Sequence, residues 1–187
     1  PLHLPDGRLW YMIPVGEKGR WEITLTVEGT SCHAATPWRG ENVTAKLATL
    51  LTRLNAYEPE LDLSNPIFDH LADLFDLPEP VTAENLAQVI DDLEDEVGER
   101  GASMLRGLSR MTLVPTIVQS GIKSNNVPET ATVICDARTL PHQDEAYVRE
   151  QLATCLGDIE VEIQVSRTAE ANASSYDTPF AEAIRRA

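Results

Sequence analysis

The sequence predicts an α+β fold, a ferredoxin-like βαββαβ sandwich in which two helices cover one face of a four-stranded antiparallel sheet. Four segments alternate apolar and polar residues, as half-buried strands do, and two segments repeat apolar residues at helical spacing. Their order along the chain is strand, helix, strand, strand, helix, strand, which is the ferredoxin-like order. An acidic helical insertion is predicted between the first helix and the second strand.

The first strand and the first helix come before the acidic segment. Residues 20–28 (RWEITLTVE) alternate strictly, so the predicted strand has one buried face, formed by Trp21, Ile23, Leu25 and Val27. Residues 41–56 carry an apolar stripe at helical spacing, made of Val43, Leu47, Leu50, Leu51 and Leu54. One face of this helix is therefore expected to pack on the sheet.

The remaining elements of the sandwich follow the acidic segment. Strands are predicted at 112–119 and 131–138, joined by a turn over 121–128. A helix is predicted at 144–155, with Val148, Leu152 and Cys155 pointing inward, and the alternation of 158–166 predicts the last strand.

The acidic segment differs sharply from its flanks. Between Tyr57 and Arg100 there are fourteen Asp or Glu residues and a single Arg, whereas the rest of the chain has sixteen acidic residues and fourteen Lys or Arg. Helical patterns occur at 66–75 and 82–97. Because its composition is so different, residues 57–111 are predicted to form an inserted helical segment. Alternatively, it is no more than a soluble helical hairpin.

Composition excludes several classes of function. The 187 residues, 42% hydrophobic and 24% charged, fit one globular domain with an insertion. The net charge of −15 argues against nucleic acid as a partner, and no apolar run is long enough to predict a membrane helix. Three cysteines without metal-type spacing (Cys32, Cys135 and Cys155) predict reduced thiols and a cytoplasmic location.

Two segments carry the residues that are best suited to bind or act on a ligand. Gly29–Pro37 (GTSCHAATP) holds His33 just after a predicted strand. Gly121–Pro141 holds Asn125 in a predicted turn, followed by Arg138 on a strand, where Asp136 shares its face. A histidine, an amide and an arginine are suited to hold a carboxylate or an oxyanion.

The order of these motifs resembles the dimerisation, or lid, domain of metallopeptidase family 20, which includes di-zinc aminoacylases, deacetylases, desuccinylases and carboxypeptidases. The resemblance covers roughly residues 14–166 apart from the acidic segment. It rests on Gly16–Gly19 (GEKG), Gly29-x-x-x-His33-Ala34-x-x-Pro37 with Gly40 and Asn42, Gly121-x-Lys123-x-Asn125-x-x-Pro128, and Asp136-x-Arg138-x-x-Pro141. In that family the lid domain is inserted into a catalytic domain. The resemblance therefore implies that 1–15 and 168–187 belong to the junctions with the catalytic domain and that 16–167 form the lid.

The resemblance also implies roles for single residues. His33 matches the histidine that reaches into the active site of the partner subunit and stabilises the oxyanion. Asn125 matches an asparagine that contacts substrate, and Arg138 matches the arginine that pairs with the substrate carboxylate. The chain departs from the family pattern at Asn126, where an aliphatic residue normally follows the asparagine. The implied protein is a homodimer that cleaves N-acyl amino acids or short peptides.

No metal site is expected within this chain, and the two zinc (or cobalt) ions of the family are expected in the catalytic domain. The four histidines (His3, His33, His70 and His142) are far apart in sequence. Adjacent acidic residues at 91–92 and 94–96 point in different directions on a helix, so they predict a solvated face.

Simpler interpretations stand beside these assignments. Arg138 can pair with Asp136 alone, and Asn125 can serve as a turn residue. Cys32 beside His33 suggests a nucleophile, but no orienting third group is visible. For the whole chain, the alternative is a free-standing ferredoxin-like module that dimerises or binds small carboxylates. A full-length sequence with His-x-Asp and Glu-Glu before residue 1 would distinguish the two.

Overall fold

The computed structural model describes residues 2–3, 9–10, 14–175 and 177–186. It divides the chain into two compact units. One consists of Lys18–Pro59 and Thr112–Ala171, and the other of residues 1–17, 60–111 and 172–187. The candidate functional residues all lie in the first unit, which we call the sandwich unit.

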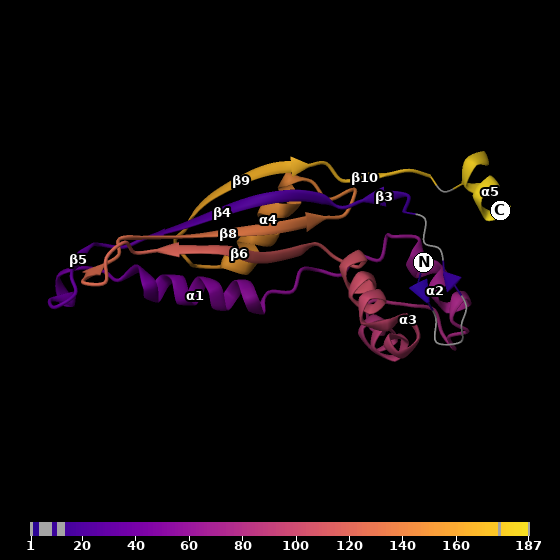
Figure 1. Ribbon diagram of the computed structural model, residues 1–187, viewed down its shortest axis with the longest axis horizontal. Coiled ribbons are helices and arrows are strands. Elements are labelled where there is room, and N and C mark those ends of the chain that lie inside the picture. The colour runs from indigo at the N-terminus through magenta and orange to yellow at the C-terminus, as the bar shows by residue number, and fades with distance from the viewer. Residues whose placement is uncertain (1, 4–8, 11–13, 176, 187) are drawn as a thin grey trace. The chain divides into compact units, whose positions relative to one another are not determined.

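The sandwich unit contains a four-stranded sheet in the order β6–β8–β4–β9, with every neighbouring pair antiparallel (Figure 1). Its strands are β4 (Gly19–Glu28), β6 (Thr112–Ser120), β8 (Thr130–Thr139) and β9 (Glu162–Ala169). Strands β4 and β6 are parallel to each other, with β8 between them. This arrangement confirms the predicted ferredoxin-like fold.

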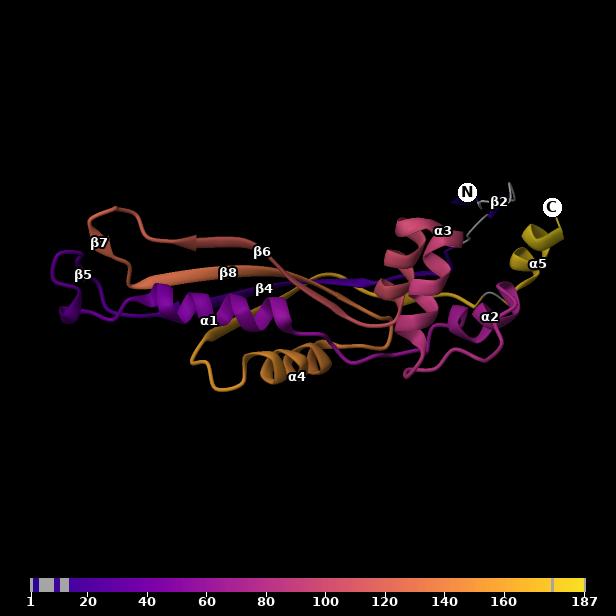
Figure 2. The same ribbon diagram turned by 90° about the horizontal axis from the view of Figure 1, so that it is seen from below.

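Helix α1 (Val43–Ala56) packs against the sheet and against α4 (Glu145–Leu156), and Figure 2 shows both helices on the same side of the sheet. The predicted inward residues are buried: Trp21, Ile23, Leu25 and Val27 on β4, Val43, Leu50 and Leu54 on α1, and Val148, Leu152 and Cys155 on α4. The remaining stripe residues of α1, Leu47 and Leu51, are half-buried.

Both helices begin at a side chain that accepts a backbone hydrogen bond. Asn42 accepts from the Thr44 amide at 3.0 Å, and Asp144 accepts from the Tyr147 amide at 3.0 Å. Each contact satisfies one of the amide groups that a helix start leaves without a partner. With these caps, α1 begins two residues after the predicted position 41 and α4 begins one residue after the predicted position 144.

Two details of the sandwich differ from the sequence prediction. The last strand begins at Glu162 rather than at residue 158, because the segment after α4 first makes a turn in which the Ile159 amide donates to the Leu156 carbonyl. The predicted turn at 121–128 contains a short strand, β7 (Asn126–Val127), which pairs with β5 (Cys32–His33). Two-residue strands are too short to produce a periodic pattern, so the sequence could not indicate this pairing.

The other unit contains the predicted acidic helices, α2 (Ile67–Leu74) and α3 (Leu86–Leu108). Helix α3 extends beyond the predicted 82–97 because Gly98, with φ of 72°, bends the chain and a second helical stretch follows. The buried apolar cluster of this unit consists of Phe68, Leu71, Leu86, Ile90, Val97, Ala102 and Leu105.

The same unit contains short elements near the chain ends. They are β1 (Leu2–His3) paired with β2 (Leu9–Trp10), β3 (Gly16–Glu17) paired with β10 (Asn172–Ala173), and helix α5 (Pro179–Arg186). Among the described residues, no helix is both long enough and apolar enough to cross a membrane.

Candidate functional site

The loop that carries His33 is fixed at its base by backbone hydrogen bonds. The Gly29 amide donates to the Glu129 carbonyl at 2.7 Å, and Thr30 and Glu41 exchange two amide–carbonyl bonds of 2.9 and 3.0 Å. Gly40 closes the loop tightly, because a Cβ there would collide with the Thr30 carbonyl oxygen and with Cys32. These backbone contacts therefore hold the base of the loop in place, and the loop projects from one end of the sheet.

His33 lies in β5 at the exposed tip of this loop. Its Nδ1 accepts a hydrogen bond from the Ala35 amide at 3.1 Å, and its carbonyl accepts from the Thr36 amide at 2.9 Å. An Nδ1 that accepts assigns the neutral ring's proton to Nε2. The ring thus presents an Nε2–H donor from a fixed position, which is the form suited to stabilise an oxyanion.

The two adjacent asparagines have different environments. The side-chain amide of Asn126 donates to Ser31 Oγ at 2.7 Å and to the Val127 carbonyl at 3.2 Å, which fastens β7 to the His33 loop. The Asn125 carbonyl accepts from the Ala34 amide at 3.0 Å, while its exposed side chain makes no hydrogen bond with any described residue. Asn125 is therefore the amide available to a ligand.

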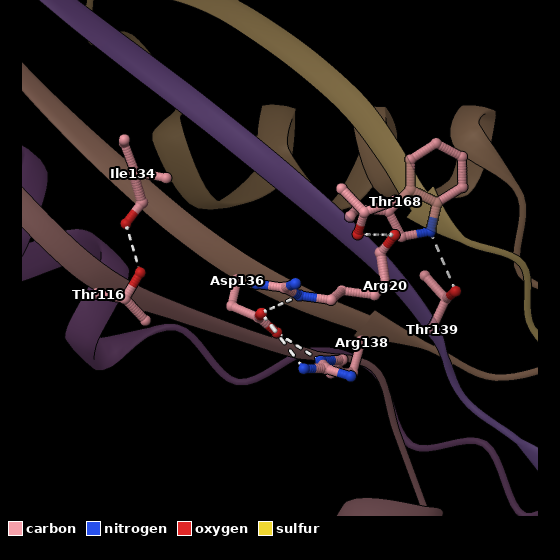
Figure 3. Close-up of polar contacts among 8 residues, drawn as sticks. Arg20, Thr116, Ile134, Asp136, Arg138, Thr139 and Thr168 are labelled. Carbon is pink, nitrogen blue, oxygen red and sulfur yellow. Dashed lines mark hydrogen bonds and ion pairs between the residues drawn. The ribbon is translucent and has the colours of Figure 1, made fainter.

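Arg138 lies near the end of β8 and is paired with a carboxylate. Its Nε is 2.5 Å from Asp136 Oδ1, and Arg20 Nε is 2.7 Å from Asp136 Oδ2, so two guanidinium groups flank one acid (Figure 3). Arg138 thus makes the ion pair with Asp136 that the simpler interpretation of the sequence allowed, and its side chain is 46% exposed. The three charges carry a net positive charge, which leaves this end of the sheet able to attract an anion.

The same end of the sheet contains Lys18. Burial, followed by the positive charge of Arg138, lowers the pKa of Lys18 to about 8. Most of this shift comes from burial of the Lys18 amine, and the charge of Arg138 adds to it. The sequence pattern singled out Arg138 here but missed Arg20, whose placement opposite Arg138 depends on the register of β4 with β8.

These contacts make the stability of the sandwich sensitive to acid. Partial burial raises the pKa of Asp136, but hydrogen bonds from Arg138 and Arg20 outweigh it and hold this pKa below the usual range. Because the folded-state pKa is the lower one, ionised Asp136 stabilises the fold above the usual Asp pKa, and this contribution is lost as the pH falls through the folded-state pKa.

We expect Asp136→Asn to reduce the free energy of unfolding by about 1 kcal/mol at pH 7, the scale of partly exposed ion pairs. The difference between variant and wild type should shrink below about pH 4, where Asp136 becomes protonated in the wild type too. Urea unfolding of the chain at pH 7, 5 and 3 measures it. A difference that is independent of pH would show that the charge of Asp136 contributes nothing.

His33 and Arg138 lie at opposite ends of the sheet. The β4–β8 pairing runs from Glu28 opposite Thr130, near the His33 loop, to Gly19 opposite Thr139, near Arg138. At a rise of about 3.4 Å per residue, this pairing separates the two ends by about 30 Å. Asn125 lies with His33, because β5 and β7 are paired. Within one chain, then, His33 and Asn125 can share a ligand but Arg138 cannot join them.

The three cysteines differ in burial. Cys32 is half-buried, and its sulfur lies 3.8 Å from the Pro37 carbonyl oxygen inside the His33 loop. Cys135 and Cys155 are buried, and burial, followed by the charge of Cys155, raises the pKa of Cys135 to about 12. All three are free thiols. A thiol that deprotonates only at high pH is a poor nucleophile.

Comparison with known families identifies the domain. Residues 15–164 match the model of the M20 peptidase dimerisation domain. The chain belongs to this family. The predicted resemblance to this family is thereby confirmed.

Two curated relatives are hydrolases of this family. The chain is 29% identical over 158 residues to the N-fatty-acyl-amino acid synthase/hydrolase of Xenopus tropicalis, covering 82% of this chain and 30% of that protein. It is 22% identical over 172 residues to a putative succinyl-diaminopimelate desuccinylase of Mycobacterium tuberculosis, covering 92% of this chain and 37% of the relative. The chain thus spans about a third of the length of these relatives.

Solved structures share the fold. An M20 family metallo-carboxypeptidase from Sulfolobus solfataricus matches with a TM-score of 0.59 at 18% identity, over 96% of this chain and 44% of that one. Human carnosine dipeptidase 1 matches with a TM-score of 0.52 at 17% identity, also over 96% of this chain and 44% of the other. At these identities the match supports the architecture, and the M20 relatives supply the hydrolase context.

The metal chemistry of such hydrolases has no counterpart in the described part of this chain. Across those residues, no three His, Cys, Asp or Glu side chains converge to hold a metal ion. His33, the candidate catalytic histidine, uses its Nδ1 on the Ala35 amide and projects alone. The described residues therefore do not fit a zinc site.

We expect the isolated chain to bind zinc only weakly and to hydrolyse no N-acyl amino acid, because it offers no convergent ligand set. Titration calorimetry with zinc at pH 7 measures the binding, and an assay on N-acetyl amino acids measures hydrolysis. Tight uptake of one equivalent of zinc would contradict the expectation.

Proposed function

We propose that this chain is the dimerisation and lid domain of a metal-dependent hydrolase that cleaves N-acyl amino acids or short peptides. The relatives are named for N-fatty-acyl amino acids, succinyl-diaminopimelate and carnosine, which supports an acylated amino acid or dipeptide as substrate. Zinc or a similar metal would be bound by a catalytic domain outside this chain. Residues 1–15 and 168–187 would lead to and from that domain, and the free thiols support a cytoplasmic protein.

The main support for this proposal is the distance between His33 and Arg138 within one chain. The sandwich unit begins at Lys18 and ends at Ala171, and both of these positions lie at the Arg138 end of the sheet, where Gly19 pairs with Thr139 and packs against Ala171. A catalytic domain joined there would have its own Arg138 nearby and its own His33 about 30 Å away. His33 would then serve the active site of the partner subunit in a homodimer.

In that assembly each residue has a distinct task. Arg138 would bind the substrate carboxylate through its planar guanidinium. The substrate carboxylate would compete for this group with Asp136. From the partner, Nε2–H of His33 would donate to the carbonyl oxygen as it gains negative charge, and the Asn125 amide would contact the substrate beside it. A free-standing module would not require this division between the two ends of the sheet.

The edge strand β6 is the surface best suited to form the dimer. It exposes Val114, Ile117 and Val118, whereas the other edge strand, β9, exposes charged and polar side chains along most of its length. Exposed apolar edges favour pairing, and charged edges oppose it. Helix α1 packs beside β6, so a two-fold contact of β6 with its symmetry mate would bring α1 to the same interface.

We expect Val118→Lys to weaken dimerisation of the chain by at least about tenfold, because it places a charge in an apolar contact. Gln164→Lys on β9 is the matched control and should leave the dimer intact. Sedimentation velocity over a range of concentrations measures both. A wild-type chain that stays monomeric throughout would mean that the catalytic domain is required or that the acidic segment blocks this edge.

A further inference from the structure

The loop that carries His33 also exposes a tryptophan. Trp38 lies in the 3-10 helix η1 (Pro37–Arg39) and is 90% exposed, whereas Trp21 on β4 is 4% exposed. An indole ring is among the largest apolar surfaces a side chain can present, and burying it is strongly favourable. Such a ring fully in water at the candidate site requires an explanation that the fold of the chain does not provide.

The backbone holds Trp38 in a fixed relation to His33. Within the loop, η1 folds back on β5: the Thr36 amide donates to the His33 carbonyl, the Arg39 amide to the Thr36 carbonyl, and the Gly40 amide to the Pro37 carbonyl. Pro37 restricts the first residue of η1, and Gly40 closes the loop at its base. The ring is thus presented on a preorganised support, as binding groups commonly are.

The direction of the substrate decides what Trp38 can contact. This step rests on the proposed function, in which Arg138 of one subunit binds the carboxylate and the His33 loop of the other approaches the scissile carbonyl. An N-acyl amino acid runs from carboxylate to nitrogen, carbonyl and then acyl group. The acyl group therefore lies on the side from which the His33 loop enters, and Trp38 is exposed on that same loop.

We propose that Trp38 is a specificity-determining residue that forms an apolar wall for the acyl group of the substrate bound in the partner's active site. It selects substrates with an apolar acyl chain over acetylated ones. Ile122, 94% exposed in the turn that leads to Asn125, belongs to the same end of the sheet and offers a second apolar surface there. Arg39, the neighbour of Trp38 on η1, supplies the control position.

The test uses the full-length hydrolase and a series of N-acyl amino acids from acetyl to octanoyl. In the wild type, kcat/KM should rise about two- to fourfold per added methylene while the chain fits along the wall. Trp38→Ala should lower kcat/KM about 10- to 100-fold for the octanoyl substrate and less than about threefold for the acetyl substrate. Trp38→Phe should restore most of the chain-length dependence, and Arg39→Ala should leave it unchanged.

The outcomes separate this assignment from the proposed function. An equal loss on all acyl chains in Trp38→Ala would mean that the indole packs against the partner's catalytic domain and does not read the substrate, which overturns the assignment. No loss on any chain overturns it as well. A wild-type enzyme that hydrolyses no member of the series, or a His33→Ala variant with full activity on the acetyl substrate, would instead refute the proposed function and the assignment that rests on it.

Discussion

In the full-length enzyme, His33→Ala is expected to lower kcat by about 100- to 1,000-fold, the scale measured for the loss of one oxyanion donor. KM should change far less, because the bond from Nε2–H strengthens only as the carbonyl oxygen becomes negative. The hydrogen bond that His33 Nδ1 accepts from Ala35 keeps Nε2–H directed outward, so the donor requires no rearrangement. Steady-state kinetics on an N-acyl amino acid measures both constants.

Arg39→Ala is the matched control, because it removes an exposed side chain from the same loop and leaves His33 in place. It should leave kcat within about twofold of the wild type, the small effect usual for a surface substitution. If both variants lose activity equally, the loss comes from general destabilisation rather than from a missing oxyanion donor. Thermal unfolding of each variant checks this directly.

Mixing two inactive variants tests whether His33 acts across the dimer. One variant lacks His33, and the other lacks the general base of the catalytic domain. If His33 serves the partner's site, each mixed dimer contains one site in which both groups are intact, so activity should return to about half of that of a wild-type dimer. If demonstrably mixed dimers stay inactive, His33 acts within its own chain or has only a structural role.

The sequence predicted the elements with long periodic patterns and missed those that depend on contacts distant in sequence. Strand β4 and helices α1 and α4 were predicted correctly because their apolar residues repeat over ten or more positions. The pairing of β5 with β7 was not predicted, since two residues carry no period and their register is set by bonds such as that of Asn126 with Ser31. The extension of α3 past Gly98 was missed for a related reason, because a glycine normally indicates a helix end.

For the candidate site, the sequence indicated the residue types but not their spatial arrangement. His33, Asn125 and Arg138 together suggest one anion-binding pocket. The register of β4 with β8 instead divides them between two ends of a strand pair. That division is a property of the fold, since Asn125 precedes β8 and Arg138 lies near its other end, so the length of this strand sets their separation. The choice of Asn125 over Asn126 likewise needed the structure, which uses the Asn126 side chain to hold the loop.

Arg138→Ala is expected to raise KM about 10- to 100-fold, the scale of a lost charge-assisted hydrogen bond, with a much smaller change in kcat. The substrate carboxylate is present in both the ground state and the transition state, so its contact contributes to binding and little to the chemical step. The substitution should not unfold the domain, because Asp136 keeps its bond to Arg20. In Arg138→Ala, the negative charge of Asp136 is neutralised by Arg20 alone, and this charge adds repulsion of the substrate carboxylate.

The carboxylate product provides the sharper measurement, because its inhibition constant reports binding without a chemical step. This constant should rise in Arg138→Ala by about the same factor as KM. Arg138→Lys should recover only part of the affinity, since an ammonium cannot form the paired bonds of a guanidinium. Arg149→Ala, which removes a surface pair with Glu145 on α4, is the control and should change neither constant. If Arg138→Ala alters stability but neither constant, Arg138 serves only to hold Asp136, and the substrate carboxylate is bound elsewhere.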